Sequence, residues 1–186
     1  LTTTLSKCPP EHRHWEWRYL SQQVNQWNQR TLFRVGRPIR RLLMTRDSSL
    51  AALQVTEDAT EDASQIGDVQ MHRFPSGQQI SALPVQASTW GPLALHPDGD
   101  LLAAIPDTNQ QSVQLWETGT GKLRRTFSHE SPVVCLGFSP DGRLLAIGGS
   151  GARVICLEIA TGTVSQAAPE AGDATALAFS PDGQRL

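Results

Sequence analysis

The residues best suited to chemistry in this chain lack the spacing that their chemistry needs. Gly119-Thr-Gly121-Lys122 contains the glycine–lysine pair that ends a phosphate-binding loop. Such a loop also needs a glycine five residues before that pair and a Ser or Thr after the lysine. Trp116 and Leu123 occupy these two places. We therefore expect this segment to be a turn between strands rather than a nucleotide site.

Histidine can act as a general base or a metal ligand, but the histidines here are poorly placed for either role. His12 and His14 are two residues apart in an expected helix, so they point to different sides and cannot chelate one ion together. His72, His96 and His129 fall at equal or neighbouring positions of the repeat described below, which indicates structural roles. No Ser/His/Asp set or carboxylate pair has a catalytic spacing. We expect no enzyme activity, catalytic residue, metal site or cofactor.

The three cysteines, Cys8, Cys135 and Cys156, are too few and too far apart for a disulfide framework or a zinc site. Cys135 and Cys156 lie within expected strands, and buried thiols at these places fit a reducing compartment. The longest apolar runs have the length of strands rather than of membrane spans. We therefore expect a cytoplasmic protein.

The elements that position these residues follow from a repeated turn. It occurs as His96-Pro-Asp-Gly99, Ser139-Pro-Asp-Gly142 and Ser180-Pro-Asp-Gly183, with successive copies 43 and 41 residues apart. A period of about 40 to 45 residues is typical of four-stranded propeller blades. Proline presets φ at the second position of a type I turn and glycine fits the fourth, so each copy predicts a hairpin.

Apolar patterns on both sides of the turns predict four short strands in each unit. First strands are expected where apolar residues alternate before the turn, and second strands where near-continuous apolar runs follow it. The first strands are expected at Leu93-Ala-Leu95, Leu136-Gly-Phe138 and Leu177-Ala-Phe179. The second, third and fourth strands are expected at residues 101–105, 112–117 and 122–127 in one unit, and at 144–148, 153–158 and 163–167 in the next.

A weaker copy of the unit precedes these. Residues 42–50 align with residues 93–101, and a second strand is expected at 50–55. The acidic residues 56–65 then form a loop insertion before a third strand at 68–72. This copy is therefore expected to be a blade as well.

The turns, the strand order and Trp116 resemble the WD-repeat β-propeller family. The resemblance implies a buried network in each blade that joins a His, a Ser or Thr, a third-strand Trp and a turn Asp. Here the network is incomplete, because Leu157 stands where one Trp belongs and Gln86 where one His belongs. The structural blade residues that the resemblance implies are Trp116, His129, Phe138, Ser139, Asp141, Gly142 and Phe179.

Residues 1–30 carry a second resemblance, in Cys8-Pro-Pro-Glu-His-Arg-His-Trp-Glu-Trp-Arg-Tyr-Leu20. This segment is similar to the linker that precedes WD-repeat arrays in planctomycete-type serine/threonine protein kinases and related large signalling proteins of bacteria. Pro9 and Pro10 suit a helix start, and apolar residues then recur at three- and four-residue steps. The stripe that they form on a helix of about residues 11–29 comprises Trp17, Leu20, Val24 and Trp27.

The expected fold class is all-β, a partial β-propeller of about three and a third four-stranded antiparallel blades preceded by one amphipathic helix. Residues 1–38 are expected to form a helical linker with a basic tail, and residues 39–186 a partial WD-repeat propeller. Its blades are expected at about 39–84, 85–128 and 129–168, with an incomplete one at 169–186. Because a propeller closes with roughly four to eight blades, we expect a fragment whose remaining blades belong to its own full-length chain.

Charge is unevenly distributed. Residues 1–46 hold nine Lys and Arg against two acids, and residues 47–186 hold seven against sixteen. The loops expected at one end of the blades are acidic, so we expect a basic protein partner, and no nucleic acid or small-molecule substrate. The candidate partner-binding residues are Glu57, Asp58, Glu61, Asp62, Trp90, Asp107, Glu130, Glu170 and Asp173.

The function expected from these observations is that of a non-catalytic scaffold for protein–protein interaction. The alternative is a regulatory or substrate-docking array of a bacterial serine/threonine protein kinase. In that case the catalytic domain is not in this chain, because the His-Arg-Asp and Asp-Phe-Gly motifs are absent.

Overall fold

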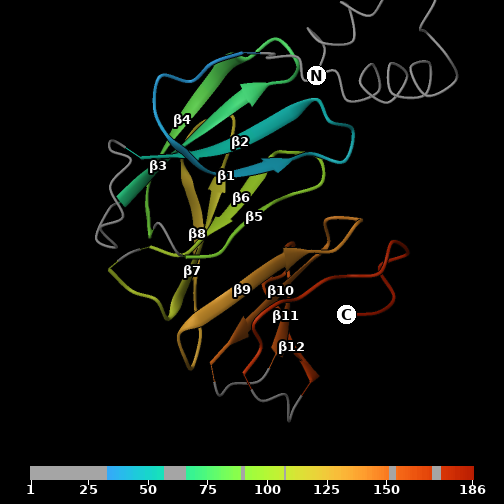
Figure 1. Cartoon of the computed structure of the whole chain (residues 1–186). Coiled ribbons are helices and arrows are strands. Elements are labelled where there is room, and N and C mark those ends of the chain that lie inside the picture. The colour runs from blue at the N-terminus through green and yellow to red at the C-terminus, as the bar shows by residue number, and fades with distance from the viewer. Residues whose placement is uncertain (1–32, 57–65, 89–90, 107, 151–153, 169–172) are drawn as a thin grey trace, which may run out of the picture. The chain divides into compact units, whose positions relative to one another are not determined.

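A computed structural model describes residues 33–56, 66–88, 91–106, 108–150, 154–168 and 173–186. In these ranges the chain forms strands and turns and no helix, which confirms the all-β fold class. The strands make three four-stranded antiparallel sheets, seen in Figure 1. The helix expected at about residues 11–29 lies outside the described residues.

Each sheet is built from four strands that follow one another in the sequence. The first sheet contains β1 (Ile39–Met44), β2 (Leu50–Val55), β3 (Ile66–Arg73) and β4 (Gln78–Ser88). The second contains β5 (Leu93–Leu95), β6 (Leu101–Ala104), β7 (Ser112–Glu117) and β8 (Leu123–Ser128). The third contains β9 (Val133–Phe138), β10 (Leu144–Gly149), β11 (Val154–Glu158) and β12 (Val164–Ala168).

The repeated turn closes the first hairpin of a sheet through a hydroxyl group, as the third sheet illustrates. The Ser139 hydroxyl donates to Asp141 Oδ1 at 2.6 Å and accepts from the backbone N–H of Leu144 at 2.9 Å. The N–H of Gly142 donates to the carbonyl oxygen of Ser139 at 2.9 Å, with Gly142 at φ 72°. Side chain and backbone therefore hold the same turn.

The weaker first copy has the same turn, although its sequence differs. The Thr45 hydroxyl donates to Asp47 Oδ1 at 2.6 Å and accepts from the N–H of Leu50 at 3.1 Å. Ser48 takes the place of the turn glycine and adopts φ 58°, a conformation that glycine adopts more readily. This agreement confirms that the first sheet belongs to the repeat.

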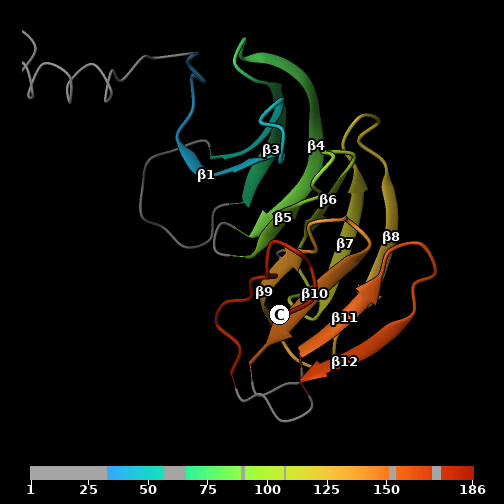
Figure 2. The same ribbon diagram turned by 90° about the vertical axis from the view of Figure 1, so that its right-hand side faces the viewer.

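The three sheets lie side by side, with their first strands β1, β5 and β9 along one side and their fourth strands along the other (Figure 2). The first strand of the second sheet, β5, contacts both β1 and β9. One apolar cluster, which includes Leu83 and Leu102, lies between the first two sheets, and a second cluster, which includes Leu115 and Leu145, lies between the second and third. The second sheet therefore buries both of its faces against neighbouring sheets, as propeller blades do, and the first and third sheets each bury one face against it.

The structure differs from expectation at Leu177-Ala-Phe179, where a first strand was expected. Residues 173–180 form no strand, because no described residue supplies a second strand to pair with them. The segment still packs beside the third blade, and the Cys135 thiol donates to the carbonyl oxygen of Ala174 at 3.2 Å. The turn after it does form, with the hydroxyl of Ser180 donating to Asp182.

Candidate functional site

The acidic loop face expected from the sequence is described at only two of its nine residues. Glu130 lies in the β8–β9 connection and Asp173 in the segment after β12, and both side chains are exposed. The other seven lie outside the described residues, and they are Glu57, Asp58, Glu61, Asp62, Trp90, Asp107 and Glu170.

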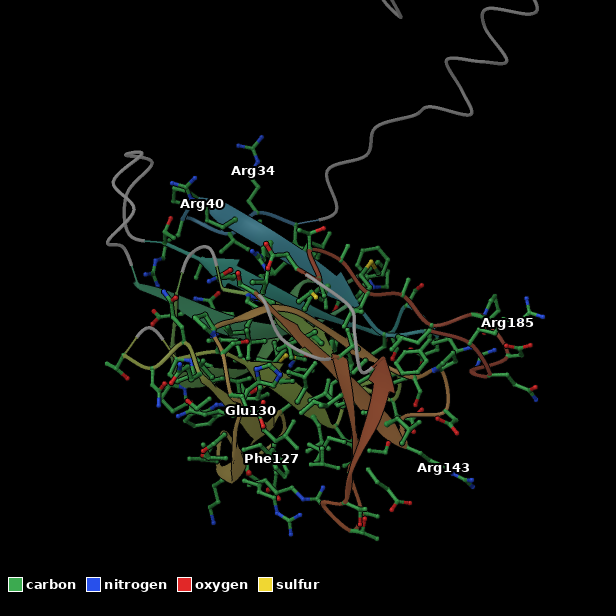
Figure 3. The ribbon with its side chains drawn as sticks, turned by 90° about the horizontal axis from the view of Figure 1, so that it is seen from below. Arg34, Arg40, Phe127, Glu130, Arg143 and Arg185 are labelled. Atoms are coloured by element: carbon green, nitrogen blue, oxygen red, sulfur yellow. The ribbon has the colours of Figure 1, made fainter. Side chains whose placement is uncertain are left out.

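Hydrogen bonds join the connections at this end of the third blade. The Ser150 hydroxyl, in the β10–β11 connection, donates to Asp173 Oδ1 at 3.2 Å. The N–H of Ala174 donates to the carbonyl oxygen of Gly149 at 3.3 Å. The N–H of Ser150 donates to the carbonyl oxygen of Pro132 at 3.2 Å. Second-to-third and fourth-to-first connections therefore meet at one end of the blade. Glu130, labelled in Figure 3, lies in the connection that precedes β9.

Trp116 and His129 do not take part in one shared network. The Trp116 side chain is buried in the cluster between the first two blades, and its indole N–H donates to Gln114 Oε1 at 3.2 Å. His129 lies in the next blade, where its Nδ1 is 2.9 Å from the carbonyl oxygen of Ser131. Each residue therefore makes a local contact within its own blade.

The remaining structural candidates lie at or beside the turns. Ser139, Asp141 and Gly142 form the turn of the third blade. The Ser139 hydroxyl, and then the Arg143 N–H, hold the pKa of the Asp141 carboxyl below its ordinary value. Phe138 and Phe179 are half-buried, and Phe138 packs against the cluster between the second and third blades.

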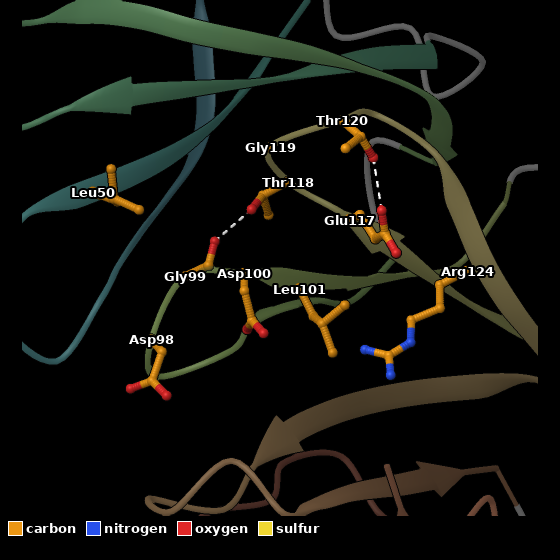
Figure 4. A pocket seen from close by; sticks show the side chains of 10 residues that line it. All are labelled: Leu50, Asp98, Gly99, Asp100, Leu101, Glu117, Thr118, Gly119, Thr120 and Arg124. Carbon is orange, nitrogen blue, oxygen red and sulfur yellow. Dashed lines mark hydrogen bonds between the residues drawn. The ribbon is translucent and has the colours of Figure 1, made fainter. Parts of the chain in front are cut away.

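A depression that the sequence did not predict lies at the opposite end of the blades, where the first two strands of each blade are joined. A hollow of about 460 Å³ opens beside the first hairpin of the second blade (Figure 4). It is lined by Leu50, Asp98, Gly99, Asp100, Leu101, Glu117, Thr118, Gly119, Thr120 and Arg124. A second hollow of about 500 Å³ is lined by Arg46, Asp47, Pro97 and Asp98. Because Asp98 lines both hollows, we treat them as one surface and call it the turn groove.

Hydrogen bonds hold the walls of the turn groove in place. The buried Thr118 hydroxyl donates to the carbonyl oxygen of Gly99 at 2.5 Å. The Ser81 hydroxyl, from β4 of the first blade, donates to the carbonyl oxygen of Thr118 at 2.5 Å. Glu117 Oε2 accepts from the Thr120 hydroxyl at 2.8 Å, as Figure 4 shows. The groove is therefore braced within the second blade and across to the first.

His96 occupies the turn position that Ser139 and Ser180 hold in the later blades. Its ring is buried, with Nδ1 2.6 Å from Asp100 Oδ1 and Nε2 3.1 Å from the carbonyl oxygen of Gly142. This side chain links the second and third blades and orients Asp100. In the sequence, the one feature that points to the turn groove is His96 at the repeat position where Ser139 and Ser180 stand in the later blades.

Residues 121–157 match the family model of the WD40 repeat, described as WD domain, G-beta repeat. This stretch comprises β8 of the second blade and β9 to β11 of the third, so the matched unit begins in one blade and ends in the next. The chain is also 31% identical over 96 residues to the periodic tryptophan protein 2 homolog of Schizosaccharomyces pombe. That match covers 50% of this chain and 11% of the yeast protein.

Two solved structures are similar in fold. Hydrazine synthase of Kuenenia stuttgartiensis aligns with a TM-score of 0.61 at 15% identity, covering 84% of this chain and 43% of that one. The Cps50 (Swd1) β-propeller domain of Myceliophteria thermophila aligns with a TM-score of 0.53 at 15% identity, covering 73% and 40% respectively.

The described residues contain no group of three or more His, Cys, Asp or Glu side chains that could hold a metal ion. No helix among them is long and apolar enough to cross a membrane. The fold, the repeat match and these similarities together support a WD-repeat relationship, and the described part of the chain is a partial β-propeller.

Proposed function

We propose that this chain contributes a non-catalytic scaffold for protein–protein interaction. The observation that carries the proposal is the joining of blade connections at one end by Ser150 and Asp173. Rigid blades that hold exposed loops in place are a frequent basis of binding surfaces. In this proposal residues 1–38 tether the propeller of residues 39–186 to the rest of a cytoplasmic signalling protein.

The partner that we propose has a basic peptide segment or a basic surface. Residues 47–186 hold sixteen acids against seven Lys and Arg, and the nine candidate residues of the loop face include eight of these acids. Opposite charge accelerates encounter, and added salt weakens the attraction. Glu130 and Asp173 are the described members of this face.

A basic synthetic peptide of alternating Lys and Ala, labelled with a fluorophore, tests the loop face directly. Its binding to the full chain is measured by fluorescence anisotropy, with an alternating Glu and Ala peptide as the control. Reversing Glu57, Asp58, Glu61 and Asp62 to Lys should weaken binding of the basic peptide, and added salt should weaken it in the unaltered chain. A variant with Gln and Asn at these positions should show an intermediate loss. Equal binding by all three chains would contradict the proposal.

The second candidate function is a regulatory or substrate-docking array of a bacterial serine/threonine kinase. It is favoured by the Cys8–Leu20 motif, which is similar to the linker in proteins of that type. The complete reading frame tests it, because a kinase predicts His-Arg-Asp and Asp-Phe-Gly motifs upstream. A complete frame without them would exclude this function.

A further inference from the structure

The turn of the second blade differs from the other three turns in how its aspartate is held. In the others, the aspartate carboxylate accepts hydrogen bonds from a Thr or Ser hydroxyl and from a backbone N–H of the same turn. In the second blade His96 replaces the hydroxyl residue, and its ring contacts Asp100 and Gly142 instead. Within the described part of the chain, no hydrogen bond or ion pair engages the Asp98 carboxylate. The replacement therefore leaves this exposed anion available to a partner.

Two arginine side chains in the turn groove are also without an ion-pair partner among the described residues. Arg124 lines the larger hollow and Arg46 the smaller one, while Asp98 lies where the two hollows meet. Among the residues that the structure describes, neither guanidinium group makes an ion pair. Both side chains are exposed. The unpaired charges of the groove are therefore Asp98, which lines both hollows, Arg124 in the larger hollow and Arg46 in the smaller one.

The other acids that line the groove are already engaged inside the protein. Asp47 accepts from the Thr45 hydroxyl and then from the backbone N–H and hydroxyl of Ser49, and these bonds lower its pKa to about 2. Asp100 lies 2.6 Å from the His96 ring, and Glu117 accepts from Thr120. These carboxylates are less available to a partner than Asp98 is.

The larger hollow, between Asp98 and Arg124, is partly apolar. Leu101 is buried and Leu50 is half-buried, and both line the larger hollow. Figure 4 shows the side chains of Asp98, Leu101 and Arg124 extending to the same side of the hairpin. Hydrogen bonds to the carbonyl oxygens of Gly99 and Thr118 hold the backbone of these turns in place before any partner arrives.

We propose that the turn groove binds an extended peptide segment of a partner protein in which one Lys or Arg is flanked on both sides by Asp or Glu. The cation of the segment pairs with Asp98, and the flanking anions pair with Arg46 and Arg124. An apolar side chain beside the cation packs in the larger hollow, which Leu50 and Leu101 line. This surface lies at the opposite end of the blades from Glu130 and Asp173, the described members of the acidic loop face, so the proposal does not depend on that face.

The first test titrates the full chain with two peptides of equal length. Both have Ala and Leu at the same positions, and the Lys and Glu positions are exchanged between them. The probe is acetyl-Glu-Ala-Leu-Lys-Leu-Ala-Glu-amide, and the control is acetyl-Lys-Ala-Leu-Glu-Leu-Ala-Lys-amide. We expect the probe to shift the backbone amide NMR signals of Gly99, Leu101 and Gly119, and the control to leave them in place. Equal shifts with both peptides, or shifts outside the groove alone, would overturn the proposal.

The second test exchanges charge at single positions. Asp98→Lys should weaken probe binding by about tenfold, because it turns an attraction into a repulsion, and it should improve binding of the control peptide. Asp98→Asn removes the charge with little change of shape and should give a smaller loss. Glu130→Lys, on the acidic loop face, should leave probe binding unchanged. Loss of binding in Glu130→Lys but not in Asp98→Lys would place the peptide on the loop face and overturn the assignment.

Discussion

The Nε2 atom of His96 lies 3.1 Å from the carbonyl oxygen of Gly142, so a side chain of the second blade's turn contacts the backbone of the third blade's turn. A similar relation exists one blade earlier, where a Cβ added to Gly99 would lie 2.7 Å from Thr45 Cγ2. Gly99 and Gly142 both have positive φ, at 78° and 72°. Two independent causes therefore favour glycine at this position of the turn.

Gly142→Ala tests both causes. The new methyl group would meet the His96 ring, and alanine would have to adopt the left-handed conformation, which alone costs about 1 to 2 kcal/mol. We expect a loss of at least that size in the free energy of unfolding, measured by urea denaturation. Gly119→Ala is the control, because no atom lies within 4 Å of its added Cβ. A Gly142→Ala variant as stable as Gly119→Ala would contradict the close packing of the two turns.

Leu102→Ala tests the packing between the first two blades. Leu102 is fully buried in the cluster there, and removing a buried leucine side chain typically costs about 2 to 5 kcal/mol. The matched control is Leu123→Ala in the outer strand β8, where the side chain is 45% exposed and the loss should be under about 0.5 kcal/mol. Guanidinium denaturation followed by circular dichroism measures both. Equal losses would show that the blades do not pack as described.

The hydroxyl of the turn controls the ionisation of its aspartate. The Thr45 hydroxyl, and then the backbone N–H and hydroxyl of Ser49, lower the pKa of Asp47 from 3.8 to about 2. Stability from the ionised carboxylate is therefore present above pH 3.8 and is lost as the pH falls through about 2. Thr45→Val should raise the pKa of Asp47 toward 3.8, measured by NMR titration of its carboxyl carbon. An unchanged midpoint would show that Thr45 does not hold this carboxylate.

Burial raises the pKa of both thiols in the third blade, Cys135 and Cys156. Because the thiolate is the reactive form, we expect both to react slowly with a disulfide reagent at pH 8 in the native state. Denaturant should make both react at once. A Cys8→Ser background restricts the count to these two thiols. Complete reaction of the native protein within the mixing time would contradict their placement.

The repeated turn and the apolar strand patterns predicted the blades well, because hairpin formation depends on residues that are close in the sequence. The strands around Ser139 and His96 formed as expected, and the weaker copy at Thr45 was recognised from register alone. The strand expected at Leu177 did not form, because a ladder needs a neighbour that the pattern of one segment cannot supply.

The turn groove was not predicted, since its walls come from residues far apart in the sequence. Leu50 belongs to the first blade, and Asp98 and Arg124 belong to two different hairpins of the second. Turn and strand patterns do not determine which side chains of separate blades meet. The exchange of a turn serine for His96 was visible in the sequence, but its consequence for Asp98 depends on where the ring points.

The contact between His96 and Gly142 also limits how this protein can be re-engineered. If the third blade were excised and grafted elsewhere, its first turn at Gly142 would lose the contact with His96 of the second blade. If the second blade were grafted, His96 would face the turn of an unrelated blade. Shuffling experiments should therefore place their crossover points inside a sheet, so that the turn residue of one blade travels with the glycine of the next. The practical building block of such chimeras is the junction between two blades.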